Sequence, residues 1–99
     1  MMFYCYILYS KYLDRFYIGA TSLAPEERLE NHLSKYYSDS KFTAKADDWI
    51  LFLVIPCSSF YQASRIESHI KRMKSKKYIR NLKLYPEIIR QLLKNIPDS

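Results

Sequence analysis

Cysteine and glycine are both scarce in this sequence. The two cysteines, Cys5 and Cys57, do not form a Cys-x-x-Cys motif, so the sequence gives no support to a zinc ribbon or a dithiol redox site. We expect both to be reduced core residues. Gly19 is the only glycine, and a glycine inside a strand marks a bulge or a close approach by another backbone or a ligand.

Long hydrophobic segments are also missing. The apolar run over residues 1–9 has no basic segment before it and no small-residue cleavage site after it. It therefore does not resemble a signal peptide, and it is too short to cross a bilayer. We expect a cytoplasmic protein with no membrane association. No internal repeat or low-complexity tract is present, and 99 residues suit a single domain with one site.

The charge is unbalanced toward the positive sign. Sixteen Lys and Arg residues against ten Asp and Glu residues give a formal net charge of +6. Such an excess favours a polyanionic partner, and nucleic acid is the leading candidate. From charge alone, an ordinary solvated basic surface is an equal alternative.

An antiparallel hairpin is predicted for residues 3–21. Two runs rich in aromatic and β-branched residues are separated by a polar break at residues 10–14, which suits a turn. The two-residue period of a strand puts Tyr17 and Gly19 on one face of the second run. If the register brings Tyr6 to the same face, two hydroxyl groups meet over one patch of the sheet.

A helix is predicted to follow from Pro25 to about Leu33 or Ser34. Proline suits the first turn of a helix, and the acidic residues after it suit the positive end of the helix dipole. Arg28 and His32, four residues apart, project on the same side of this helix. The polar segment 35–48 has no sustained period, and we interpret it as a loop.

The apolar run from Trp49 to Ile55, ended by Pro56, predicts a buried central strand. A second helix follows, capped by Ser58 or Ser59. Its apolar stripe consists of Ala63, Ile66, Ile70 and Met73, and Glu67 stands beside it. A short third helix is expected over residues 76–82, and Pro86 begins a last one, whose apolar face packs on the same domain.

This order of elements predicts an α+β domain. A small central three-stranded antiparallel sheet is flanked by helices, with an extra C-terminal helix. We divide the chain into a domain core at residues 1–83 and a C-terminal helix with a short tail at residues 84–99.

The ordered set of motifs resembles the GIY-YIG nuclease domain. The two motifs that name the family correspond to Tyr4-Cys5-Tyr6, in which only the last tyrosine is retained, and to Tyr17-Ile18-Gly19, which is intact. The resemblance continues through Arg28 and His32 to Glu67, over roughly residues 2–82. It is strongest to small stand-alone bacterial members, and the family also includes the excision-repair nuclease subunit.

The resemblance implies a metal-dependent endonuclease that hydrolyses phosphodiester bonds in DNA, with a connection to DNA repair. Its implied catalytic residues are Tyr6, Tyr17, Arg28, His32 and Glu67. Glu67 would hold one Mg²⁺ or Mn²⁺ ion, since these ions keep several waters and need few protein ligands. Arg28 would bind a phosphate oxygen, and Tyr17 would contact the attacking water.

Some positions depart from the family pattern. Many members carry a lysine after the second motif where this chain has Ala20, so Lys41 or Lys45 would have to replace it. The sequence leaves open which tyrosine, or the metal ion, supplies the base. Three further positions are assigned to the site: Gly19, which is also a strand glycine two residues after Tyr17, and Thr43 and Asn81, which the resemblance alone implies.

Six lysines are predicted to bind nucleic acid: Lys41, Lys45, Lys71, Lys74, Lys76 and Lys77. The DNA substrate could be branched or damaged, and a partner protein could provide targeting. The first alternative function is a nucleic-acid-binding module with weak or no catalysis, in which exposed tyrosines stack on unpaired bases. The second is an interaction domain whose last helix docks a partner.

Overall fold

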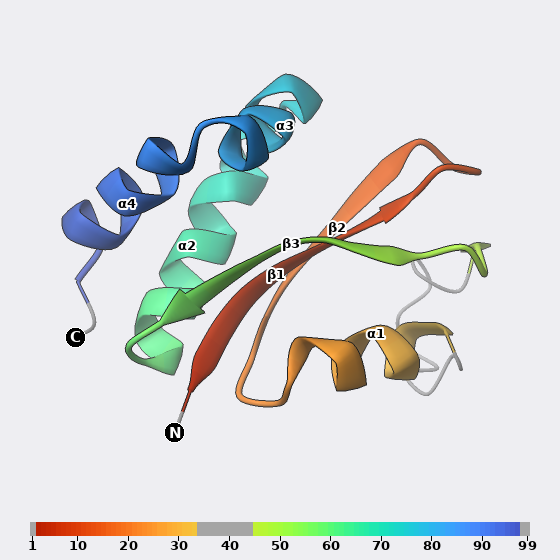
Figure 1. The fold of residues 1–99 in the computed structure, drawn as a ribbon, viewed down its shortest axis with the longest axis horizontal. Coiled ribbons are helices and arrows are strands. Elements are labelled where there is room, and N and C mark those ends of the chain that lie inside the picture. The colour runs from red at the N-terminus through yellow and green to blue at the C-terminus, as the bar shows by residue number, and fades with distance from the viewer. Residues whose placement is uncertain (1, 34–44, 98–99) are drawn as a thin grey trace.

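The structure, a computed structural model, describes residues 2–33 and 45–97. Two strands come first, β1 (Phe3–Ser10) and β2 (Arg15–Thr21), followed by helix α1 (Pro25–Leu33). Strand β3 (Ile50–Cys57) then precedes three helices, α2 (Phe60–Met73), α3 (Lys76–Leu84) and α4 (Pro86–Asn95). Figure 1 shows α2, α3 and α4 on one side of the sheet and α1 on the other. The predicted α+β class and three-stranded antiparallel sheet are confirmed.

The strand order is β2-β1-β3, so β1 lies in the centre of the sheet. The prediction that residues 49–55 form the central strand is wrong, because β3 is an edge strand. A continuous apolar run does not distinguish a central strand from an edge strand that is covered by helices. Pro56 does not end β3 but lies within it, which an edge strand tolerates because its outer side makes no ladder hydrogen bonds.

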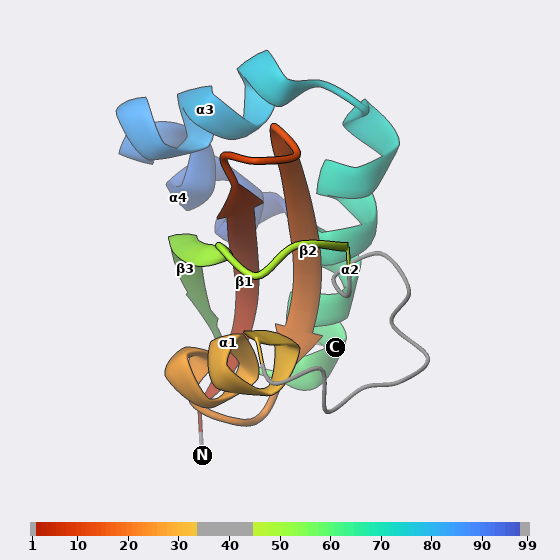
Figure 2. The same ribbon diagram turned by 90° about the vertical axis from the view of Figure 1, so that its right-hand side faces the viewer.

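Each face of the sheet has its own hydrophobic cluster, in accordance with strand alternation. On the α2 face, Cys5 and Ile7 of β1 pack with Ile66 and Ile70 of α2. On the α1 face, Tyr6 and Leu8 pack with Trp49, and Leu29 and Leu33 of α1 complete that cluster. Figure 2 shows the three strands side by side, with β1 between β3 and β2.

Both cysteines are free and buried, as predicted. Burial raises the pKa of the Cys5 thiol far above its usual range, with the nearby Cys57 and Glu67 acting in the same direction. Cys5 therefore stays protonated as a core residue.

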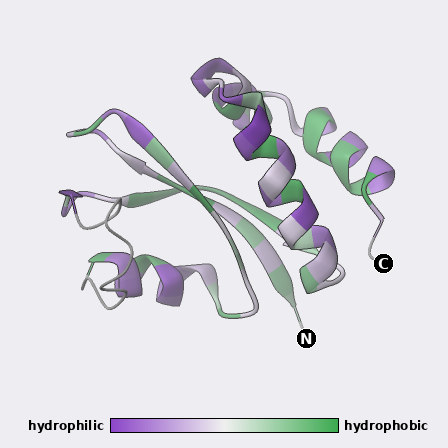
Figure 3. Ribbon diagram, turned by 180° about the vertical axis from the view of Figure 1, so that it is seen from behind, coloured by the Kyte–Doolittle hydropathy of each residue, from purple (hydrophilic) through white to green (hydrophobic). Residues whose placement is uncertain are grey.

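Helix α2 begins at its N-cap Ser59, whose hydroxyl accepts a hydrogen bond from the Gln62 backbone N–H at 3.1 Å. In Figure 3 its ribbon alternates between hydrophobic and hydrophilic residues from turn to turn. Ala63, Ile66 and Ile70 are buried as predicted, but Met73 is 45% exposed. Met73 is the last residue of the helix, beyond the edge of the sheet that the stripe covers.

The chain turns between α2 and α3 at Lys74, which has φ 48°, and Ser75 caps α3 through the Tyr78 backbone N–H. Helix α3 runs to Leu84 rather than Leu82. Helix α4 begins at Pro86 and is held to α2 by the Gln62 side chain, whose Nε2 donates to the carbonyl oxygens of Leu93 and Ile96. No helix in the described residues is long and apolar enough to span a membrane.

Candidate active site

The hairpin register places two tyrosines on the α1 face of the sheet. Tyr6 pairs with Gly19, and Leu8 pairs with Tyr17, so Tyr6 and Tyr17 are diagonal neighbours. Their ring centroids are 6.3 Å apart. The sequence-based expectation that both hydroxyl groups share one face is therefore confirmed.

Gly19 makes this arrangement possible. A β carbon at position 19 would lie 2.5 Å from both Cζ and Oη of Tyr6, closer than non-bonded heavy atoms approach. The Tyr6 ring lies directly against the backbone of Gly19 in the neighbouring strand. A close approach at the only glycine was expected from the sequence, and the approaching group is an aromatic side chain of the same hairpin.

Helix α1 adds two polar side chains to the tyrosines. Tyr6 Oη lies 3.0 Å from His32 Nε2, and Arg28 Nε donates to the same oxygen at 3.2 Å. Arg28 can only donate, so the Tyr6 oxygen accepts from it, and the donor in the Tyr6–His32 bond depends on the imidazole tautomer. We call these four residues, Tyr6, Tyr17, Arg28 and His32, the tyrosine cluster.

The electrostatics of the tyrosine cluster keep His32 neutral. Burial and, to a smaller extent, the charge of the Arg28 guanidinium lower the pKa of His32 to about 4. A neutral imidazole carries one proton, so Nε2 accepts from Tyr6 in the tautomer with the proton on Nδ1. The ring of His32 also lies 4.7 Å from that of Tyr17, measured between centroids.

The two tyrosines differ in their access to solvent. Tyr6 is 0% exposed, whereas Tyr17 is only half-buried. A water molecule or a substrate can therefore reach Tyr17, while Tyr6 is enclosed among protein atoms.

Glu67 is not part of this cluster. It lies on α2, which packs on the opposite face of the sheet, and its carboxylate forms an ion pair with Lys71 at 2.8 Å. Its side chain is 20% exposed. Of the five predicted catalytic residues, four lie together and the fifth lies on the other side of β2.

Comparison with protein families decides the family. The model of the GIY-YIG catalytic domain matches residues 2–80, which is most of the chain. The chain belongs to the GIY-YIG family. Membership implies nuclease activity in general, and GIY-YIG nucleases act on DNA. No curated protein and no solved structure matches the chain.

The donor set of this GIY-YIG domain fits a single hard cation. No group of three or more His, Cys, Asp or Glu side chains suitable for a metal occurs within residues 2–33 and 45–97, so a site built entirely from such ligands is absent there. One partly exposed carboxylate, that of Glu67, suits Mg²⁺ or Mn²⁺, which take their remaining oxygens from water and substrate. Such an ion would have to replace Lys71 as the partner of Glu67.

Four of the six predicted nucleic-acid-binding lysines line one cavity: Lys45, Lys71, Lys74 and Lys76. Lys77 is exposed on α3 and does not line it. Asn81 lies on α3, away from the tyrosine cluster, and its carbonyl accepts the Tyr85 backbone N–H. Lys41 and Thr43 lie outside the described residues.

Sequence reasoning missed two charged residues near this cavity. Arg15, at the start of β2, is part of its lining. Asp14 forms ion pairs with Lys76 at 2.8 Å and with Arg80 at 3.6 Å. The polar break between the predicted strands was the only signal for them, and it indicated a turn without indicating what the turn contacts.

Proposed function

We propose that this chain is a metal-dependent endonuclease that hydrolyses phosphodiester bonds in DNA, with Tyr17 directing the attacking water. The observation that supports this most strongly is the hydrogen-bonded group of Arg28, Tyr6 and His32 beside the accessible Tyr17. A purely structural core would not need a buried tyrosine and histidine joined to a partly buried arginine, because burying polar groups is costly.

Tyr17 is the residue that we assign to the water. It is half-buried, whereas Tyr6 is 0% exposed. An unperturbed phenol has a pKa of about 10, so using it as a base at neutral pH costs about 4 kcal/mol. We therefore assign Tyr17 to orienting the water, which needs no deprotonated phenol.

Tyr6 and His32 act as positioning residues. The phenol of Tyr6 accepts from Arg28, so its oxygen fixes the orientation of the guanidinium, and we assign His32 Nε2, 3.0 Å away, as the acceptor of its proton. Because the pKa of His32 is lowered to about 4, this acceptor is retained throughout the neutral pH range. The base role that the sequence left open for Tyr6 is disfavoured by its complete burial.

Arg28 is the residue that we assign to the phosphate. Its Nε is used by Tyr6, and a guanidinium has further N–H donors that match two phosphate oxygens. A fixed, partly buried cation stabilises the charge that develops on those oxygens in the transition state. Lysine could not replace it, because a single ammonium cannot bind both Tyr6 and a phosphate with a planar fork.

Glu67 is the residue that we assign to the divalent ion. When bound, Mg²⁺ or Mn²⁺ would polarise the phosphate and lower the pKa of water. The carboxylate belongs to α2 and Tyr17 to β2, the edge strand against which α2 packs. The substrate would therefore lie along the open edge of β2, with Tyr17 and Glu67 on either side of it.

The alternative, a nucleic-acid-binding module with weak or no catalysis, is supported by one specific observation. Glu67 already has a partner in Lys71 and no hydrogen bond to the tyrosine cluster within the described residues. Ala20, in place of the lysine found in many relatives, points in the same direction. In either case, targeting to branched or damaged DNA and any partner protein are further proposals that need their own tests.

The deciding experiment is a nicking assay on plasmid DNA and on a branched substrate, with Mg²⁺, Mn²⁺ or EDTA. The purified protein should nick only with a divalent ion. Glu67→Ala should remove nicking while leaving DNA affinity in EDTA largely intact. Nicking by this variant at the normal rate would contradict the assignment of the ion to Glu67.

A matched control is available on α4. Glu87, like Glu67, is a helix glutamate in a local ion pair, with Arg90 at 3.8 Å. Glu87→Ala should leave nicking unchanged. If the wild-type protein binds DNA but gives no product with any metal, the binding module is the correct function.

A further inference from the structure

A cavity of about 510 Å³ lies between β2 and the junction of α2 and α3. Five of its lining side chains are positively charged and come from three separate segments of the chain: Arg15, Lys45, Lys71, Lys74 and Lys76. No Asp or Glu of the described residues lines it. We call this cavity the cationic pocket.

The surface of the cationic pocket is mixed, with polar and apolar parts of similar size. Ile18, Ile70 and Ile79 line it and are 8%, 1% and 6% exposed, and they belong to the hydrophobic core. Every charged group in the lining is a cation, so a charged ligand of the pocket should be an anion.

The positive charge of the pocket is only partly neutralised. Lys71 pairs with Glu67 and Lys76 pairs with Asp14, each at 2.8 Å. Arg15, Lys45 and Lys74 form no ion pair with a carboxylate of the described residues. A phosphate group would reduce the repulsion among these three cations.

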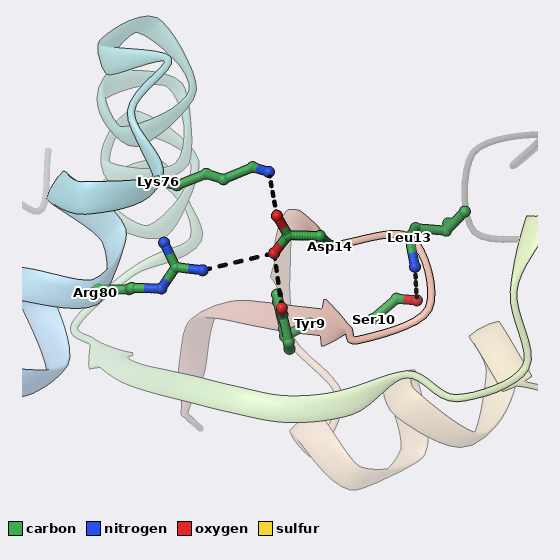
Figure 4. A network of polar contacts seen from close by, with 6 residues as sticks. All are labelled: Tyr9, Ser10, Leu13, Asp14, Lys76 and Arg80. Carbon is green, nitrogen blue, oxygen red and sulfur yellow. Dashed lines mark hydrogen bonds and ion pairs between the residues drawn. The ribbon is translucent and has the colours of Figure 1, made fainter.

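Figure 4 shows Asp14 in contact with Lys76, one of the residues that line the pocket. Its carboxylate accepts a hydrogen bond from Tyr9 Oη at 2.7 Å and contacts Lys76 and Arg80 of α3. These three contacts lower the pKa of Asp14, with the hydrogen bond from Lys76 as the largest cause. Asp14 is therefore ionised at neutral pH, and it forms an ion pair with Lys76, one of the cations that line the pocket.

The pocket and the tyrosine cluster share one short stretch of β2. Phe16 and Ile18 line the pocket, whereas Tyr17 between them points to the opposite face, as strand alternation requires. Adjacent residues of a strand rise only about 3.3 Å. The two sites are consequently back to back across the edge strand of the sheet.

We propose that the cationic pocket binds a backbone phosphate of the nucleic acid, and so fixes a strand that crosses the edge of β2 from the α2–α3 side to Tyr17. This inference rests on the proposed function, because it places one phosphate in the pocket and the next part of the strand at the tyrosine cluster. Asp14 competes with that phosphate for Lys76 and limits the affinity.

The test uses two double variants with the same change in charge. Arg15→Gln with Lys74→Gln removes two cations of the pocket that have no carboxylate partner within residues 2–33 and 45–97. Arg90→Gln with Lys94→Gln removes one arginine and one lysine from exposed positions on α4. Both pairs of positions are exposed, and glutamine retains much of the side-chain length, so we expect both proteins to fold; thermal unfolding checks this.

Binding to a fluorescent DNA duplex is measured in EDTA at several salt concentrations, so that no cleavage interferes. Each phosphate contact contributes about −0.9 to the slope of log affinity against log salt on duplex DNA. For the pocket variant, the magnitude of this slope should fall by about 1 to 2, and the affinity at moderate salt should fall roughly tenfold. Both quantities should change little for the α4 variant. Equal losses in the two variants would overturn the proposal, because binding would then depend on net charge alone.

A second arm distinguishes a backbone phosphate from a free one. Inorganic phosphate is titrated into the isotope-labelled protein, and amide shifts of residues 15–18 and 71–76 are followed by NMR. Shifts at millimolar phosphate together with a DNA affinity that the pocket variant retains would assign the pocket to free phosphate and contradict a nucleic-acid role.

The proposed nuclease function and the phosphate-binding role of the pocket can be tested separately. If the wild-type protein does not nick DNA, binding in EDTA still decides whether the pocket holds the strand. If the protein does nick DNA, the pocket variant should need a higher DNA concentration for half-maximal nicking, whereas Glu67→Ala should remove nicking at every DNA concentration. A slow rate at saturation would place the pocket residues in catalysis and overturn the binding role.

Discussion

The two faces of β2 hold their polar side chains in different ways. On the α1 face, Tyr6 and His32 are buried and their hydrogen bonds are protected from water. On the α2–α3 face, Lys71 and Lys76 form ion pairs whose members are 20–57% exposed. Burial fixes the geometry of the first group, whereas solvent screens the second and lets its members exchange partners.

This difference predicts how stability and binding should respond to substitutions in the two groups. Substitutions on the α1 face should alter stability and geometry together, with weak dependence on salt. Substitutions on the α2–α3 face should alter binding, with strong dependence on salt and little effect on folding. Substitutions on one face or the other test this contrast.

Gly19→Ala should have the largest effect. The added β carbon would lie 2.5 Å from the Tyr6 ring, and the enclosed ring cannot move away without displacing His32 and Arg28. Overpacking of this kind costs typically about 1–3 kcal/mol, and here we expect about 3 kcal/mol or more. Urea unfolding should show the loss of stability, and nicking should fall with it.

Ala20→Gly provides the control for this change. It alters the neighbouring residue of the same strand, whose side chain packs on the other face, and adds no atom to the cluster. If Gly19→Ala were as stable as the wild type, the close contact with Tyr6 would not be a constraint on the site.

The pH dependence of stability should reflect His32. Its folded pKa of about 4 lies below the ordinary value of 6.5, so the unfolded chain binds more protons between these values. Stability is therefore complete above pH 6.5 and is lost as the pH falls toward 4, by roughly 3 kcal/mol in total. Urea unfolding at a series of pH values measures this loss.

His32→Gln removes the titrating group while keeping a polar side chain at the position. The variant should be less stable at pH 7 but should lose much less stability than the wild type between pH 6.5 and 4. The same dependence on pH in both proteins would show that His32 is not held neutral by the fold.

Tyr6→Phe should mainly reduce stability, whereas Tyr17→Phe should mainly reduce nicking. Removing the Tyr6 hydroxyl leaves His32 and Arg28 without a shared partner in a buried region, which costs about 1–3 kcal/mol. Tyr17 is half-buried, so its hydroxyl should matter less for stability and more for nicking. The free energy of unfolding and the single-turnover cleavage rate are measured for both variants. A normal cleavage rate for Tyr17→Phe would contradict this contrast.

How much of this contrast the sequence predicts depends on the range of the contacts. The hairpin and the helix from Pro25 follow from local periodicity and turn residues, whereas the shared face of Tyr6 and Tyr17 also required the register of the two strands. The position of β3 at the edge did not follow, since strand order depends on long-range pairing. The separation of Glu67 from the tyrosines depends equally on which face α2 covers, and helical periodicity alone does not determine that.

The cationic pocket illustrates the same limit. Lys71, Lys74 and Lys76 were predicted to bind nucleic acid because they are close in sequence. Arg15 joins them only because the hairpin folds onto the junction of α2 and α3, and Asp14 reaches Lys76 for the same reason. Charge density along a sequence thus predicts a basic surface, but it does not predict which acidic residue restrains it.

Asp14→Asn should have the smallest effect on stability and a measurable effect on binding. Asparagine tolerates the positive φ of 50° at this position, and exposed ion pairs contribute little to folding. The unfolding midpoint should hardly move. Release of Lys76 and Arg80 should raise DNA affinity a few-fold at low salt, with an advantage that shrinks as salt screens the charges. Glu87→Gln makes the same change of charge on α4 and should raise affinity much less. Equal gains in the two variants would mean that Asp14 acts through net charge and not as a competitor at the pocket.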